Sequence, residues 1–375
     1  MAIDAQERAA LAEAVRDASS AGPREFLDDH GRPQRDGQLW KVLTEQMGLG
    51  GLLVPEADGG AGAGVAELAV VLENLGATLA VVPALSSIGI AGTLLRVAGT
   101  TQARAMSVRL SEDGLAATVC WPDPASMPPA GVSATACRAT DSESVIVSGR
   151  AEFVLDGADA DVVLVPVTID GTDAIVAVDT AAPGLTRTAM TGLDLTRGMA
   201  VVEFLDAPGT LVADNVSLET AADLALVLIA AEQVGIAQQC LQVAVAWAKD
   251  RVQFDRPIGQ FQAIKHQLVD LLMATELARS ALDVAVAAAD AYLAAPSDAV
   301  ARELSVAASA AKARCGDAAM VVADECLHIL GGIGFTWEHD AHLYLRRAKA
   351  LEVLMGTPAD HRSRYAVLLL EDSAR

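Results

Sequence analysis

Apolar residues recur at helical spacing throughout the C-terminal half of the chain. The helical patterns run over Ser217–Asp250, about Gln260–Ala294 and Ser297–Leu330. An apolar residue every three or four positions forms one apolar helix face, which must be buried against other helices. Thr357 has the features of a helix N-cap, with proline next and aspartate three residues on. The pattern therefore predicts a C-terminal four-helix bundle over residues 213–375.

The period of the apolar pattern changes twice before the bundle. Residues 1–112 keep helical spacing in Ala5–Ser19, Gln38–Met47 and Val65–Gly76. Residues 113–212 instead contain short, mostly β-branched runs separated by Gly, Asp and Pro: Val145–Val147, Ala151–Leu155, Val162–Val167, Ala174–Val178 and Val201–Leu205. We therefore expect an α+β multidomain fold, in which an N-terminal helical domain, a small middle β domain and the bundle follow one another.

Composition and charge indicate which classes of binding partner do not fit the protein. The 375 residues carry a formal net charge of -22, which argues against nucleic acid and anionic membranes as partners. An anionic ligand would need a local basic site. The five cysteines form no CxxC pair, which favours free thiols over disulfides or a metal site. The acidic start resembles no secretory signal, and the most apolar run, Leu224–Ala231, is too short to span a bilayer, so we expect a cytoplasmic protein.

The segment between the first two long helices is the strongest candidate for ligand binding. Residues Arg251–His266 read RVQFDRPIGQFQAIKH. A simple link between helices needs only a few polar or glycine residues. This one contains aromatic, guanidinium and amide groups, which suit a flat, charged ligand.

A second motif makes the pattern specific. Residues Leu327–Glu338 read LHILGGIGFTWE, and they are followed by Leu345–Ala348 (LRRA) and Met355–Thr357 (MGT). With Arg251–His266 in this order and spacing, the chain resembles the acyl-CoA dehydrogenase family over nearly its whole length. Two weaker similarities to the family are Val54-Pro55-Glu56 before a glycine run and the segment Leu193-Asp194-Leu195-Thr196-Arg197.

The resemblance implies FAD as cofactor, an acyl-CoA thioester as substrate, electron-transfer flavoprotein as electron acceptor, and a homotetramer or related assembly. It also implies that Arg251 and Phe254 contact the FAD of a neighbouring subunit, because a guanidinium matches the pyrophosphate. Further FAD contacts are implied along the two C-terminal motifs and in the β domain, at His328, Gly331, Gly332, Gly334, Thr357 and Phe153. Arg251 could instead cap its helix, and Gly331 could end one.

The catalytic base is where the chain departs from the family. The commonest base is a glutamate immediately before the Gly-Thr of the last motif, and here that residue is Met355. The family's second base position falls on Ala225. Glu232, two helical turns further on, interrupts an apolar run and is the remaining candidate, with a pKa raised by burial. The simpler interpretation, which we favour, is that Glu232 forms an ion pair with a basic residue of the bundle.

Three hypotheses follow. The chain is an FAD-dependent acyl-CoA dehydrogenase with Glu232 as a relocated base, or it is a subunit without a base in a heterotetramer with a homologous subunit. Heteromeric members of the family are known for sterol side-chain substrates, which makes a sterol side chain one candidate. The third hypothesis, a helical interaction protein without flavin, leaves the FAD-type motifs without a use.

Overall fold

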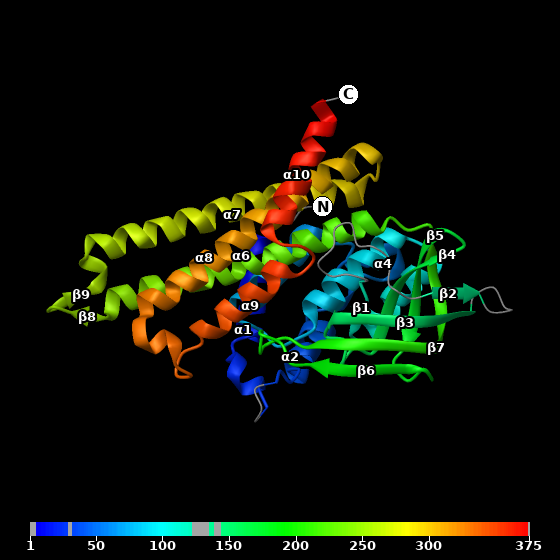
Figure 1. Ribbon diagram of the computed structural model, residues 1–375, viewed down its shortest axis with the longest axis horizontal. Coiled ribbons are helices and arrows are strands. Elements are labelled where there is room, and N and C mark those ends of the chain that lie inside the picture. The colour runs from blue at the N-terminus through cyan, green and yellow to red at the C-terminus, as the bar shows by residue number, and fades with distance from the viewer. Residues whose placement is uncertain (1–4, 29–31, 122–134, 139–143, 374–375) are drawn as a thin grey trace.

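The computed structural model describes residues 5–28, 32–121, 135–138 and 144–373 (Figure 1). The first part of the chain forms α1 (Ala5–Ala18), α2 (Gly37–Lys41), α3 (Val65–Ala77), α4 (Gly92–Ala98) and α5 (Thr101–Glu112). Two segments are π-helical: η2 (Val42–Gln46) directly follows α2, and η5 (Ala84–Ala91) directly precedes α4. Helix α3 is buried along most of its length between α1 and the C-terminal bundle, which matches its largely apolar sequence.

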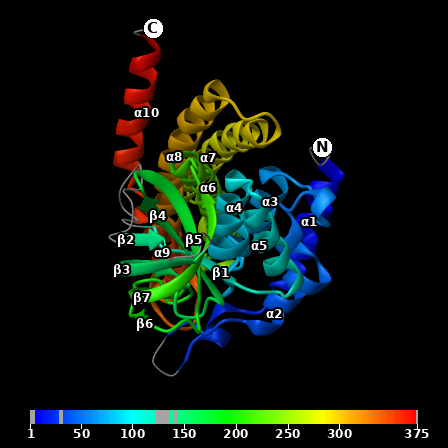
Figure 2. The same cartoon turned by 90° about the vertical axis from the view of Figure 1, so that its right-hand side faces the viewer.

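The middle of the chain forms a seven-stranded sheet. Its strands are β1 (Ala117–Val119), β2 (Thr135–Arg138), β3 (Ser144–Leu155), β4 (Val162–Ile169), β5 (Thr172–Asp179), β6 (Leu185–Met190) and β7 (Met199–Asp214). The strand order is β1-β4-β2-β3-β7-β5, and β6 pairs with β7. Because β4 also pairs with β5, the path returns to β4 and closes into a ring. Figure 2 shows the strands beside the N-terminal helices, with α10 extending away from both.

The C-terminal part contains three helices of 33 residues each, α6 (Leu218–Asp250), α7 (Gln262–Ala294) and α8 (Asp298–Leu330). They are followed by the turn η7 (Gly331–Phe335) and by α9 (Ala341–Val353) and α10 (Pro358–Ser373). A two-stranded hairpin, β8 (Val252–Gln253) and β9 (Arg256–Pro257), with the short turn η6 (Ile258–Gln260), joins α6 to α7. The helical bundle and the β domain predicted from the sequence are both confirmed.

Side-chain caps begin several of these helices where the sequence predicts them. The Ser217 hydroxyl accepts from the Thr220 amide at the start of α6. At α10, the Thr357 hydroxyl accepts from the Asp360 amide, and the Asp360 carboxylate accepts from the Thr357 amide, which forms a reciprocal capping box.

Two hydrophobic cores hold the chain together. The larger runs without a break from the N-terminal helices through α6 into α8 and α9, so these helices pack as one body. The smaller lies inside the β domain. The boundaries expected near residues 112 and 212 fall between α5 and β1 and close to the end of β7. Four cysteines described with their side chains, Cys120, Cys240, Cys315 and Cys326, are free and buried.

Within the part of the chain that the structure describes, two helices are long and apolar enough to cross a membrane. The sequence interpretation considered only the short run Leu224–Ala231 inside α6. By length and composition, Leu218–Asp250 and Asp298–Phe335 both qualify. The apolar window of the first is completely buried inside the protein, and that of the second is half buried. Burial in the core therefore accounts for the hydropathy of α6.

The sequence interpretation differs from the structure in several elements, and it contains neither β1 nor β2. The predicted helix Gln38–Met47 is α2 followed by a π-helical turn. The runs Val145–Val147 and Ala151–Leu155 belong to one strand, β3, which carries two register shifts against β7. Strand β6 is missing from the prediction because none of its residues is fully buried, so it has no apolar alternation.

Candidate functional site

One small pocket lies where the N-terminal helices, the β domain and the bundle meet. Its walls are mainly apolar. This junction pocket is lined by Ser86 and Ile90 from η5, Thr118, Val119 and Trp121 from β1 and beyond, Phe153, Val154 and Leu155 from β3, and Leu354 and Met355 after α9. The pocket therefore brings together two positions singled out from the sequence, Phe153 and Met355.

Both of these residues have left-handed backbone conformations. The φ angle is 56° at Phe153 and 57° at Met355. Such a conformation is unfavourable for a side chain of this size and persists only where the surrounding structure enforces it. Residues held in this way cluster at functional sites, so their presence in the wall of one pocket marks it as the candidate active site.

Two buried side chains, Lys312 and His361, hydrogen-bond to the backbone of the turn that carries Met355. The Lys312 ammonium donates to the carbonyls of Glu352 and Gly356, at 3.0 Å each. The His361 ring nitrogen Nε2 lies 2.8 Å from the Met355 carbonyl. Burial lowers the pKa of Lys312 to about 8 and that of His361 to about 4. These contacts fix the turn and leave the Met355 side chain, only 2% exposed, against the pocket.

The structure offers no proton acceptor at either usual position. Among the residues that the structure describes, no Asp or Glu lines the junction pocket. Ala225 is completely buried in α6. One carboxylate is linked to the pocket through a single hydrogen bond. Asp156 accepts a 2.6 Å hydrogen bond from the pocket residue Ser86. Burial raises the pKa of Asp156 against the opposing effects of Arg197 and Ser86. The sequence analysis missed Asp156, because its proximity to Ser86 joins residues 70 positions apart.

Glu232 does not have the raised pKa that the base hypothesis expected. Its carboxylate lies 2.8 Å from the Arg197 guanidinium and 2.6 Å from that of Arg347. Burial alone would raise the pKa of Glu232, but the two guanidiniums outweigh burial, so the pKa is lowered. The expectation of a raised pKa is therefore wrong, and the ion-pair interpretation is confirmed, with one of the two arginines coming from outside the bundle.

This ion pair belongs to a buried cluster that joins the β domain to the bundle. Arg347 on α9 also pairs with Asp194, at 2.6 Å, and donates to the Thr196 carbonyl at 2.8 Å. Asp194, Thr196 and Arg197 lie in the segment between β6 and β7 that resembles the family. All five side chains are at most 8% exposed. The segment therefore has a structural role, since it fixes one domain against the other.

The residues expected to hold the rest of FAD lie at the opposite end of the bundle. We call this region the bundle end, defined by the hairpin segment Arg251–Pro257 and the turn Gly331–Phe335. Figure 1 shows the hairpin at the end of α6 and α7 that points away from the β strands. Phe254 is 85% exposed with φ 53°, and the Arg251 guanidinium lies 5.7 Å from the Trp247 ring. Neither side chain is engaged by an acidic group within the described part of the chain.

The three glycines of the second motif have different structural roles. Gly331 ends α8 with φ 67°, which confirms it as a C-cap. A Cβ on Gly334 would lie only 3.0 Å from the Leu327 carbonyl, so close packing against α8 requires a glycine there. A Cβ on Gly332 would meet nothing within 4 Å, so its backbone is open to an approaching ligand.

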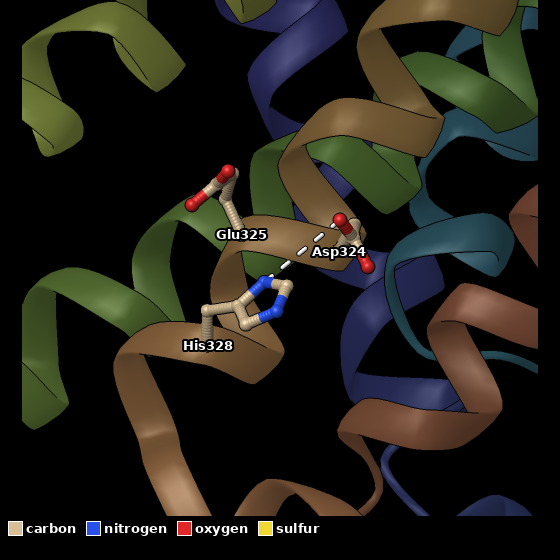
Figure 3. Close-up of side chains that lie close together, drawn as sticks. All are labelled: Asp324, Glu325 and His328. Carbon is tan, nitrogen blue, oxygen red and sulfur yellow. Dashed lines mark ion pairs between the residues drawn. The ribbon is translucent and has the colours of Figure 1, made fainter.

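His328 has an acidic environment that the sequence analysis did not anticipate. Figure 3 shows its ring turned toward Asp324, with an Nδ1–Oδ2 distance of 3.8 Å, and Glu325 on the same turn of α8. These three side chains bring possible metal-ligand atoms within 4.8 Å of one another. They are largely exposed, and Glu325 already accepts from Gln267, so we assign no metal to them. Two carboxylates beside His328 also disfavour a phosphate group there.

Thr357 is occupied by its capping role. Its hydroxyl donates to the Asp360 carboxylate at 2.6 Å, and the hydrogen bonds from Thr357 lower the pKa of Asp360.

The residues that fit FAD are of two kinds. Arg251, Phe254 and Gly332 offer an unpaired cation, a ring and open backbone at the bundle end. In the junction pocket, Phe153 offers a half-exposed ring, and the buried Trp121 indole N–H has no acceptor among the described residues.

Comparison with known proteins agrees with this architecture. The family models "Acyl-CoA dehydrogenase, N-terminal domain" and "Acyl-CoA dehydrogenase, C-terminal domain" match residues 5–109 and 218–367. The chain is 33% identical to acyl-CoA dehydrogenase IpdE2 of Mycolicibacterium smegmatis over 330 residues, which is 88% of this chain and 87% of that protein.

Solved structures of the same fold cover almost the whole chain. A steroid ACAD named Tcur3481-Tcur3483 superposes with a TM-score of 0.85 and 25% identity over 99% of both chains. The ChsE4-ChsE5 complex of Mycobacterium tuberculosis superposes with a TM-score of 0.84 and 26% identity over 98% of both chains. In sequence and in fold, the chain belongs to the acyl-CoA dehydrogenase family of oxidoreductases.

Proposed function

We propose that this chain is a subunit of a heteromeric, FAD-dependent acyl-CoA dehydrogenase whose catalytic carboxylate is supplied by a second, homologous subunit. The single observation that carries the proposal is the junction pocket, where Met355 takes the place of the base and no described carboxylate lines the wall. Abstraction of the α-proton of a thioester requires a positioned base, and a thioether cannot accept that proton.

The bundle end explains why such a subunit would be retained. Arg251 and Phe254 are exposed at the end of the bundle remote from the junction pocket of the same chain, and Arg251 makes no ion pair with a described residue. In an assembly, they would hold the phosphates and the adenosine of FAD bound mainly by the neighbouring subunit. FAD, when bound, supplies the hydride acceptor of the α,β-dehydrogenation, and electron-transfer flavoprotein is the proposed acceptor of its electrons.

Two relatives support an assembly of unlike subunits and a steroid-type substrate. The solved structures described above include a protein named as a complex of two different chains and a protein named as a steroid ACAD. By extension, we propose that this chain works with a homologous partner on the CoA thioester of a bulky, sterol-derived acyl group.

The alternative is that the chain catalyses dehydrogenation alone. The Ser86–Asp156 hydrogen bond favours this second function, because it links the pocket to a carboxyl group whose pKa is raised. In this version the α-proton passes to the Ser86 oxygen while the Ser86 proton passes to Asp156. FAD, when bound, would supply the acceptor for the β-hydride.

Expression of the chain alone and together with a homologous acyl-CoA dehydrogenase subunit separates the two functions. We expect the chain alone to show no dye reduction with a panel of acyl-CoAs, and the purified complex to bind FAD and turn over. The Met355→Glu variant of the isolated chain, with Met355→Gln as an isosteric control, tests whether a carboxylate alone is lacking. Turnover by the unmodified chain alone, abolished in Asp156→Asn, would contradict the proposal and establish the alternative.

A further inference from the structure

A second cavity lies in the N-terminal helical part, on the other side of η5 from the junction pocket. We call it the N-terminal cleft. Including the open solvent at its mouth, its empty space is about 730 Å³. Ser86 and Ile90 of η5 face the junction pocket, whereas Ser87 and Ile88 face this cleft. One π-helical segment therefore separates the two cavities, and π-helical turns recur at functional sites.

The interior of the N-terminal cleft is largely apolar, and polar atoms in its walls already have hydrogen-bond partners within the protein. Its apolar lining residues include Leu53, Ile88, Leu95 and Leu110. Ser87 accepts from the Ala117 amide at 2.9 Å, the Thr44 hydroxyl donates to the Trp40 carbonyl, and the Trp40 indole donates to the Gly114 carbonyl. The interior thus suits an aliphatic chain, which gains free energy in proportion to the apolar area it buries.

The rim of the cleft is basic in a chain that is strongly acidic. Arg96 and Arg104 line it, and no Asp or Glu is among its described lining residues, although the net charge of the chain is -22. Arg104 donates to the Gly99 carbonyl at 2.9 Å and lies 3.7 Å from the Asp58 carboxylate. Arg96 makes no ion pair or side-chain hydrogen bond within the described residues. An unpaired guanidinium beside an apolar hollow matches a carboxylate head on an aliphatic tail.

We propose that the N-terminal cleft binds an aliphatic carboxylate, a free fatty acid of medium length, with its tail between α4, α5 and η5 and its head on Arg96. The proposal goes beyond the dehydrogenase function and does not depend on it, since its evidence is a separate cavity. Arg104 would contribute a second, weaker contact, because Asp58 already offsets part of its charge.

Calorimetric titration of the purified full-length chain with sodium decanoate, below its micelle concentration, tests the proposal without any turnover. We expect one saturable site, about tenfold weaker binding in Arg96→Gln, and a larger loss in the Arg96→Gln, Arg104→Gln double variant. The matched control is Arg109→Gln, on the same helix α5 but outside the cleft and paired only with Asp113 at 3.9 Å, which should bind as the wild type does.

Two ligand controls and one blocking variant complete the experiment. Decanol, which lacks the charge, and acetate, which lacks the tail, should both bind much more weakly than decanoate. Ser107→Trp, which places a large side chain at the half-buried rim, should abolish binding while the melting temperature stays unchanged. Three results would overturn the proposal: no saturable heat, equal binding by decanol, or binding that survives Arg96→Gln but is lost in Phe153→Ala, which would place the tail in the junction pocket.

Discussion

The junction pocket and the bundle end compare differently with the residues that the family resemblance implies. The bundle end keeps its exposed arginine, its exposed phenylalanine and its open Gly332 backbone. The junction pocket has a strained turn at Met355, where the family resemblance implies a carboxylate. Under the proposed function, contacts to a shared cofactor and the chemistry at the reacting carbon can therefore be lost independently, because one chain presents them at two separate places.

The largest expected effect concerns the buried ion cluster beside the junction pocket. Glu232→Gln removes the charge that Arg197 and Arg347 share, which leaves Arg197 buried without its ion-pair partner and Arg347 paired with Asp194 alone. We expect the free energy of unfolding to fall by about 3–5 kcal/mol. Because the pKa of Glu232 is lowered in the folded state, its stabilisation is complete above the ordinary glutamate pKa and is lost as the pH falls through the folded value.

Urea unfolding at pH 7 measures this loss, and Glu303→Gln, at an exposed position on α8, is the control and should change stability little. If Glu232→Gln unfolds like the wild type, the cluster does not hold the domains together. If it folds normally and specifically loses turnover in the assembled enzyme, Glu232 has a catalytic role after all.

The second effect tests the support of the Met355 turn. Lys312 has a folded pKa of about 8, below its value in an unfolded chain, so between these values the unfolded state binds one more proton. Stability should therefore rise with pH above about 8, by roughly 1.4 kcal/mol per pH unit, until the unfolded lysine also titrates. Unfolding free energies from pH 7.5 to 10 for wild type and Lys312→Met measure the difference.

Lys41→Met, at an exposed lysine, should keep the pH dependence of the wild type. A constant difference between wild type and Lys312→Met across this range would mean that the Lys312 ammonium stays charged in the folded protein. The Met355 turn would then be held by a full positive charge.

Whether the sequence predicts a contact depends on how far apart the two residues lie along the chain. The caps at Ser217 and Thr357 were predictable because capping joins residues three positions apart. The contacts of Arg347 with Thr196 and Glu232 join residues 151 and 115 positions apart, so no local pattern reveals them. The same holds for the exposure of the bundle end and for Ser86 beside Asp156, which the fold alone brings together.

The third effect tests the role of the bundle end in cofactor binding. In the assembly with its homologous partner, Arg251→Met would remove the proposed charge-assisted contact to FAD, so we expect the affinity for FAD to fall roughly 10–100-fold. The matched control on the same hairpin is Arg256→Met, whose guanidinium lies 4.1 Å from the Phe261 ring of its own chain. Flavin fluorescence during dilution of the complex measures both. An equal loss in the two variants would mean a general effect of charge and would remove Arg251 from the proposed site.

The smallest effect separates a helix cap from a ligand contact at Thr357. Because its hydroxyl is hydrogen-bonded to Asp360 at 2.6 Å, we assign it to the start of α10 rather than to FAD. Thr357→Ala should lower the free energy of unfolding by about 1 kcal/mol, and Thr357→Ser should restore most of it. The FAD content of the assembled enzyme should stay the same in both variants, measured by absorbance after gel filtration. Loss of FAD in Thr357→Ala without loss of stability would reverse the assignment, and the turn after Met355 would then bind cofactor even though it lacks the base.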